Sequence, residues 1–168
     1  MKLYLQATCF LVCFCLGAAL LRPGLGSAQS YRSLEGVESV QAVFDIRDDN
    51  PENVLFHLQL VHDTYKDKEI RSADGRPDFA VVFMDLSVTL LSQDREGFTP
   101  KEKQTLEKMD ALLEKMAAEG IQLEVCLVAT DFFGLDPKSF PPEIELVPNG
   151  WIASIGYQAK GYSLVPVY

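Results

Sequence analysis

Cys126 is the residue of this sequence with the clearest chemical potential. The 168-residue chain holds four cysteines, and the other three, at positions 9, 13 and 15, fall in an apolar N-terminal segment. If that segment is removed on export, Cys126 has no partner for an internal disulfide. A lone cysteine in an exported protein is buried and inert, bridged to a second chain, or a working thiol.

Five further residues are candidates for a binding site around this cysteine. In an open parallel sheet, functional side chains gather beyond the carboxyl ends of the strands. The strands expected below bring polar and aromatic residues to that edge, and we predict a binding role for five of them: Arg47, Ser87, Thr130, Asn149 and Trp151. Cys126 is the candidate catalytic residue, because its thiolate is a nucleophile.

Acidic residues at the same edge bear on that chemistry. The carboxylates of Asp48, Asp49, Asp85 and Asp131 would oppose formation of a thiolate if they lie close to it. A carboxylate-rich edge could instead hold a hard cation, but Asp and Asn also favour the caps of helices. The two histidines are five residues apart on an expected helix and point about 140° away from each other, so they cannot chelate one metal. We therefore predict no metal site and no cofactor.

Composition excludes several classes of protein. A length of 168 residues fits one domain, and 48% apolar residues allow a packed core. The chain has 24 acidic against 15 basic residues, a net charge of −9. This acid excess argues against nucleic acid as a partner and against docking on anionic lipid, because both need clustered Lys and Arg.

The N-terminus has the pattern of a secretory signal peptide. A lysine precedes an apolar run over 3–21, an arginine follows it, and small residues lead up to Ala28. We predict a signal peptide over 1–28, an N-terminal extension over 29–39 and one α/β domain over 40–168. The protein is then periplasmic or extracellular. The alternative is an uncleaved N-terminal segment that anchors the protein in a membrane.

The rest of the chain alternates strands with helices. Short β-branched or apolar runs predict five strands, at 40–46, 79–84, 121–128, 143–147 and 163–167. Capping residues and helical apolar periodicity predict helices at 51–65, 100–119 and 150–160, with a short helical or irregular piece at 87–92. This order indicates an α/β protein with three layers, α/β/α, built on a mainly parallel sheet of about five strands.

Three stretches of the sequence resemble the DsrE/DsrF-like family of small sulfur-relay-type proteins. They are 117–126 (AAEGIQLEVC), 133–135 (FGL), and the C-terminal block 147–152 (VPNGWI) with 157–162 (YQAKGY). The resemblance implies the three-layer fold and assembly into a trimer or hexamer. It also implies that Cys126, which matches the sulfur-carrying cysteine of the family, accepts sulfur as a persulfide. After the second strand, where many members have a His-Gly pair, this chain reads FMDL.

Two functions fit these observations. The first is an exported DsrE-like protein that binds or carries sulfane sulfur on Cys126 and exchanges it with a donor or acceptor protein. It would be a sulfur carrier or a sulfurtransferase-like enzyme without a standard catalytic motif. The second is a non-catalytic module of the same fold that binds a small ligand or forms oligomers. In that case Cys126 is inert, and Arg47, Ser87, Asn149 and Trp151 line the site.

Overall fold

The computed structural model describes residues 31–71 and 76–168 of the chain. The signal peptide predicted over 1–28 lies outside the described residues, and so does its cleavage site after Ala28. No helix among the described residues is both long enough and apolar enough to cross a membrane.

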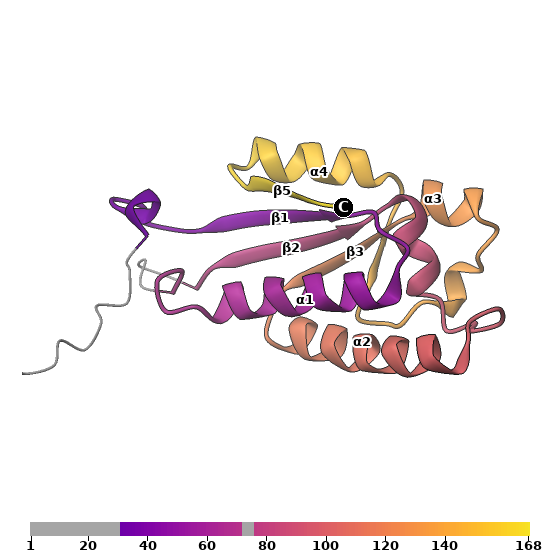
Figure 1. Ribbon diagram of the computed structural model, residues 1–168. Helices are drawn as coiled ribbons and strands as arrows, with labels where there is room; N and C mark the ends of the chain where they lie inside the picture. The colour runs from indigo at the N-terminus through magenta and orange to yellow at the C-terminus, as the bar shows by residue number, and fades with distance from the viewer. Residues whose placement is uncertain (1–30, 72–75) are drawn as a thin grey trace, which may run out of the picture. The chain divides into compact units, whose positions relative to one another are not determined.

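Five strands of the described residues form one parallel sheet (Figure 1). They are β1 (Gln41–Ile46), β2 (Asp78–Phe83), β3 (Gln122–Cys126), β4 (Glu145–Val147) and β5 (Ser163–Val167). Their order in the sheet is β4-β3-β2-β1-β5, so β2 is central and β3 is second from one edge. Pro166, which has no N–H to donate, lies in the edge strand β5.

Helices cover both faces of the sheet. The long helices α1 (Pro51–Lys66) and α2 (Pro100–Ala118) lie side by side on one face, and α4 (Gly150–Ala159) lies on the other (Figure 1). The buried apolar side chains of β1, β2 and β3 fill the space between these layers. The predicted α/β class, with three layers and a parallel sheet of five strands, is confirmed.

Capping residues set where the two long helices begin. The Asn50 side chain accepts hydrogen bonds from the backbone N–H groups of Glu52 and Asn53 at the start of α1. Thr99 and Glu102 form a reciprocal capping box at the start of α2. Each such cap is worth about 1 kcal/mol of stability, and a proline at the first helical position fixes the backbone for the following turn.

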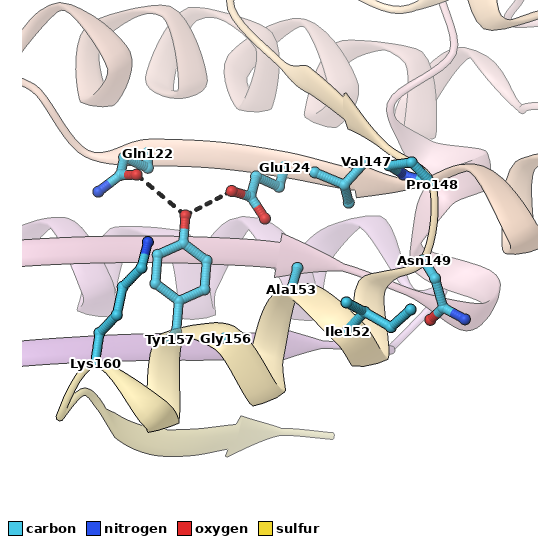
Figure 2. A pocket seen from close by; sticks show the side chains of 10 residues that line it. All are labelled: Gln122, Glu124, Val147, Pro148, Asn149, Ile152, Ala153, Gly156, Tyr157 and Lys160. Atoms are coloured by element: carbon cyan, nitrogen blue, oxygen red, sulfur yellow. Dashed lines mark hydrogen bonds between the residues drawn. The ribbon is translucent and has the colours of Figure 1, made fainter.

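The alternation of side chains along β3 decides what faces each helical layer. Leu123 and Val125 are buried on the face covered by α1 and α2. Gln122 and Glu124 point to the opposite face, which α4 covers (Figure 2). Cys126 follows in the same alternation and lies against Gly150, the first residue of α4. One strand therefore presents a row of three polar or reactive side chains to α4.

The ends of several elements differ from the sequence-based expectation. The strand expected over 121–128 stops at Cys126, and Leu127–Phe132 forms a short helix, α3. A short apolar run fits a strand and a buried helix equally well, so periodicity could not separate them. The piece expected over 87–92 is the 3₁₀ helix η2 (Asp85–Leu90). Two further 3₁₀ helices among the described residues are η1 (Arg32–Leu34) and η3 (Pro137–Ser139).

Candidate functional site

A cavity of about 380 Å³ opens at the carboxyl ends of β1, β2 and β3. Four of the six predicted site residues line it together: Cys126, Arg47, Asn149 and Trp151. The remaining lining residues come from the segments that follow β2 and β3: Met84, Asp85, Val128, Ala129, Phe132 and Phe133. The structure thus brings together side chains that are far apart in the sequence.

Ser87 and Thr130, the other two predicted binding residues, are not among the residues that line this cavity. Both are fully buried. The Ser87 hydroxyl lies 2.7 Å from the carbonyl oxygens of Ile46 and Met84, so it ties the end of β1 to the end of β2. The Thr130 hydroxyl donates to the carbonyl of Cys126 at 3.0 Å. Both hydroxyls hold the backbone on which the cavity is built.

Cys126 lies at the junction of β3 and α3 and is 6% exposed. Gly150, the first residue of α4, packs directly against it: a Cβ added to Gly150 would lie 3.0 Å from the Cys126 Cβ. The same added Cβ would lie 2.5 Å from Cγ of Met84. The absence of a side chain at Gly150 therefore lets the N-terminal end of α4 approach the cysteine. That end carries the positive potential of the helix dipole.

The charged groups around the cavity have opposite signs. Arg47 donates from Nη2 to Oδ2 of Asp45 at 2.7 Å, and this hydrogen bond is the main cause of its raised pKa. The negative charge of Asp85 acts in the same direction. Asp85 adopts a positive φ of 56°, a backbone conformation that Asp tolerates better than most residues. Asp85 was expected at this edge as an acidic residue that opposes the thiolate, and it lines the cavity. Neither Asp85 nor Met84 was predicted as a binding residue, and no sequence signal pointed to the positive φ.

The other acidic residues of this edge do not line the cavity. Asp48 accepts hydrogen bonds from the backbone N–H of Asn50 at 2.9 Å and from the side chain of Asn53 at 3.0 Å. The Asn50 bond is the largest cause of the lowered pKa of Asp48. Asp48 thus supports the start of α1. Among residues 31–71 and 76–168, no group of three or more His, Cys, Asp or Glu side chains is arranged to hold a metal ion.

Exposed apolar side chains form the rim of the cavity. Phe132 is 81% exposed, Trp151 is 65% exposed, and Val128 is exposed as well. Neither histidine of the chain lines the cavity, and His62 instead contacts Glu119 on α2's C-terminal side at 2.9 Å. The cavity thus offers a thiol, a guanidinium and an apolar wall, without an imidazole to act as a general base.

A second cavity, of about 440 Å³, lies between β3, β4 and α4 (Figure 2). Its polar residues are Gln122, Glu124, Asn149, Tyr157 and Lys160, and Asn149 also lines the first cavity. Sequence reasoning missed this site. The available signal was the pair of polar residues at alternate positions within an otherwise apolar strand, the sequence QLEVC.

Comparison with known proteins identifies the family. The model of the DsrE/DsrF-like family matches residues 41–167, which is most of the chain. An uncharacterized protein of Aquifex aeolicus (strain VF5) is 24% identical over 128 residues, a match that covers 76% of this chain and 56% of that protein. The chain thus matches little more than half of the length of this relative.

Two solved structures are similar to this chain. MTH1491 from Methanobacterium thermoautotrophicum, described as a protein of unknown function, has a TM-score of 0.59 at 16% identity, with 76% of this chain and 99% of that one covered. The ychN protein from E. coli has a TM-score of 0.48 at 15% identity, with 77% and 98% covered. The likeness to MTH1491 agrees with the fold, and the match of the family model over residues 41–167 shows that the chain belongs to the DsrE/DsrF-like family.

Proposed function

We propose that Cys126 accepts sulfane sulfur as a persulfide in the cavity at the carboxyl ends of the strands. The observation that carries the proposal is the position of Cys126, in a cavity and directly against the first residue of α4. Membership of a family with a sulfur-relay-type fold supports the same chemistry. The donor would be a small persulfide or the persulfide of a partner protein, and the acceptor would be a thiol.

The proposed step is a transfer between sulfur atoms. The Cys126 thiolate attacks the outer sulfur of a donor R–S–SH, and a bond forms between Sγ and that sulfur. The bond between the two donor sulfurs breaks, and the donor leaves as the thiolate R–S⁻. The product is Cys126–S–SH, and the transferred sulfur keeps its proton. Charge and atoms balance without an oxidant, a reductant or a metal.

The surroundings of Cys126 support this step through electrostatics and shielding. The amide end of α4 favours negative charge on the attacking and leaving sulfurs. The guanidinium of Arg47 acts in the same direction but is partly offset by Asp45, with which it is paired. Asp85 acts against both the helix end and Arg47, and its exposure to water weakens that effect. Cys126 is 6% exposed, and this burial limits access of water to a persulfide, while Phe132 and Trp151 line the cavity through which a donor approaches.

The proposal also extends to location and assembly. The sequence over 1–28 has the pattern of a signal peptide, so the persulfide would form outside the cytoplasm. The exposed apolar side chains of α4, Trp151, Ile152 and Ile155, are compatible with a trimer or hexamer.

Mass spectrometry of the intact protein and of its peptides tests the persulfide. The full chain, incubated with inorganic polysulfide and freed of excess reagent, should gain the mass of one sulfur atom on the peptide that contains Cys126. The variant Cys126→Ser keeps Cys9, Cys13 and Cys15 and should not gain sulfur on that peptide. A wild-type peptide that stays unmodified, while the polysulfide modifies a small thiol in the same tube, would contradict the proposal.

Binding of a small ligand without covalent chemistry is the second candidate function. The burial of Cys126 and the exposed aromatic rim of the cavity favour it. Alkylation of the folded protein separates the two functions. A carrier cysteine reacts with iodoacetamide in the native state, whereas an inert packing residue reacts only after unfolding.

A further inference from the structure

We propose that the second cavity binds the ammonium group of a small aliphatic amine, with the free carboxylate oxygen of Glu124 as its acceptor. This site is separate from the Cys126 thiol, although Asn149 lies on the wall of both cavities. The proposal therefore does not depend on sulfur chemistry. Three observations carry it, namely an unpaired buried oxygen, an imbalance of charge and an apolar wall.

The first observation is the unpaired oxygen of Glu124. This residue is 8% exposed, and its Oε1 accepts a hydrogen bond of 2.5 Å from the hydroxyl of Tyr157. Its Oε2 has no hydrogen-bond partner among the residues that the structure describes, and the atom itself is buried. Figure 2 shows the carboxylate directed from β3 towards α4, into the space between them. A buried carboxylate oxygen without a donor is costly, so such a group calls for a partner.

The second observation is an excess of negative charge. Glu145 lies directly opposite Glu124 in the parallel register of β3 and β4. Of the described residues that line the cavity, Lys160 carries the one positive charge, and its Nζ lies 5.7 Å from the centre of the Tyr157 ring. Burial raises the pKa of Glu124, and Glu145 adds to the rise. The two carboxylates and the single lysine leave one negative charge, which one bound ammonium ion would balance.

The third observation is the composition of the walls. Val147, Ile152 and Ala153 line the cavity beside Glu124 and offer an apolar surface to an aliphatic chain (Figure 2). A metal ion fits less well, because Glu124 is the one carboxylate among the described residues that line the cavity, and a hard cation needs several oxygen ligands. A ligand with a cationic head and a short apolar tail matches both ends of this site.

Titration followed by ¹H–¹⁵N NMR tests the site, with n-butylamine as the probe. The probe should shift the amide signals of Val147, Ile152 and Ala153 in the full chain, in a saturable way. Glu124→Gln keeps an oxygen for the Tyr157 hydroxyl but removes the charge, and it should weaken butylamine binding roughly tenfold or more, as expected for loss of a charge-assisted hydrogen bond. The neutral probe n-butanol should bind no better to wild type than to Glu124→Gln.

A second variant keeps the test valid if Glu124→Gln folds poorly. Gly156 lines the cavity from α4, and a Cβ added there meets no atom within 4 Å. Gly156→Leu should therefore fold and fill the cavity, and butylamine binding should be lost. Cys126→Ser should bind butylamine as wild type does.

Three binding results, and one result on self-association, would overturn the proposal. The binding results are equal affinity of butylamine for wild type and Glu124→Gln, unchanged binding in Gly156→Leu, or tighter binding of butyrate than of butylamine. The last result would mean that Glu124 is protonated and donates to an anion. Loss of the site on self-association, seen as butylamine binding only to dilute protein, would assign the cavity to a second copy of the chain instead.

Discussion

Gly150 and Gly156 offer a matched pair of substitutions within one helix. Both lie in α4, and neither has a positive φ. An added Cβ at Gly150 would lie 2.5 Å from Cγ and 2.6 Å from Sδ of Met84, and 3.0 Å from Cβ of Cys126. An added Cβ at Gly156 has no neighbour within 4 Å. We expect Gly150→Ala to destabilise the protein and Gly156→Ala to stabilise it.

The size of the difference follows from these contacts. Carbon atoms in normal contact are about 3.5–4.0 Å apart, so the Cβ at position 150 overlaps Met84 by about 1 Å or more. Met84 is 3% exposed but lines the first cavity, so a shift of its side chain into that space can relieve part of the overlap. Overpacking of this kind costs about 1–3 kcal/mol. Replacing glycine by alanine inside a helix returns about 0.5–1 kcal/mol, with a smaller gain at the first helical residue. The two variants should therefore differ by roughly 1–4 kcal/mol in the free energy of unfolding, with Gly150→Ala the less stable of the two.

Urea unfolding followed by circular dichroism measures this difference, with wild type as the reference for both variants. A second readout is the rate at which iodoacetamide alkylates Cys126, located by peptide mapping. This rate should change in Gly150→Ala, because α4 and Met84 must move away from the sulfur, and it should stay unchanged in Gly156→Ala. The reasoning would be refuted if Gly150→Ala proved as stable as Gly156→Ala, with the alkylation rate of wild type.

Two further predictions concern charge and assembly. Because burial raises the pKa of Glu124 above its ordinary value of 4.5, the native state binds more protons than the unfolded state between that value and the raised pKa. The unfolding free energy of wild type should thus fall relative to that of Glu124→Gln as the pH rises through this window. Urea titrations measure both free energies, and the same pH dependence for the two proteins would contradict the raised pKa. Tyr157, Glu145 and Lys160 also contribute to the pKa of Glu124. Light scattering should find a trimer or hexamer, and Ile155→Lys on the exposed face of α4 should move the population towards monomer; a wild-type monomer at all salt concentrations would count against this assembly.

The sequence was sufficient to predict the family and the layers of the fold. Strand-like apolar runs, capping residues and the alternation of elements are local signals, and they located the five strands and the starts of α1 and α2. The run expected as a strand over 121–128 was wrong at its end, because residues from Leu127 onward form α3. The meeting of Arg47, Cys126 and Asn149 at one cavity follows from the rule that the carboxyl ends of parallel strands share an edge. That rule places residues at an edge but does not say which of them reach the cavity.

The parts that sequence reasoning missed depend on contacts between distant segments. The bond between Glu124 and Tyr157 joins residues 33 positions apart, and nothing in either local sequence signals it. The approach of Gly150 to Cys126 likewise depends on how α4 is placed over the sheet. Ser87 had the residue type of a binding group, but its hydroxyl is used to join two strand ends. Chemical type alone could not separate these uses.

Because β3 supplies side chains to both cavities, a change in the length of this strand alters the two cavities together. Gln122, Glu124 and Cys126 reach α4 because they are spaced by two residues, with Leu123 and Val125 between them in the opposite core. Deleting one residue early in β3 would turn Glu124 and Cys126 towards α1 and α2 and would bring apolar side chains beneath α4. A single insertion or deletion in this strand would therefore disrupt both cavities in one step. Substitutions on α4, in contrast, can alter one cavity and leave the other intact. Changes of ligand specificity would therefore arise by substitutions on α4, while the length and register of β3 stay the same.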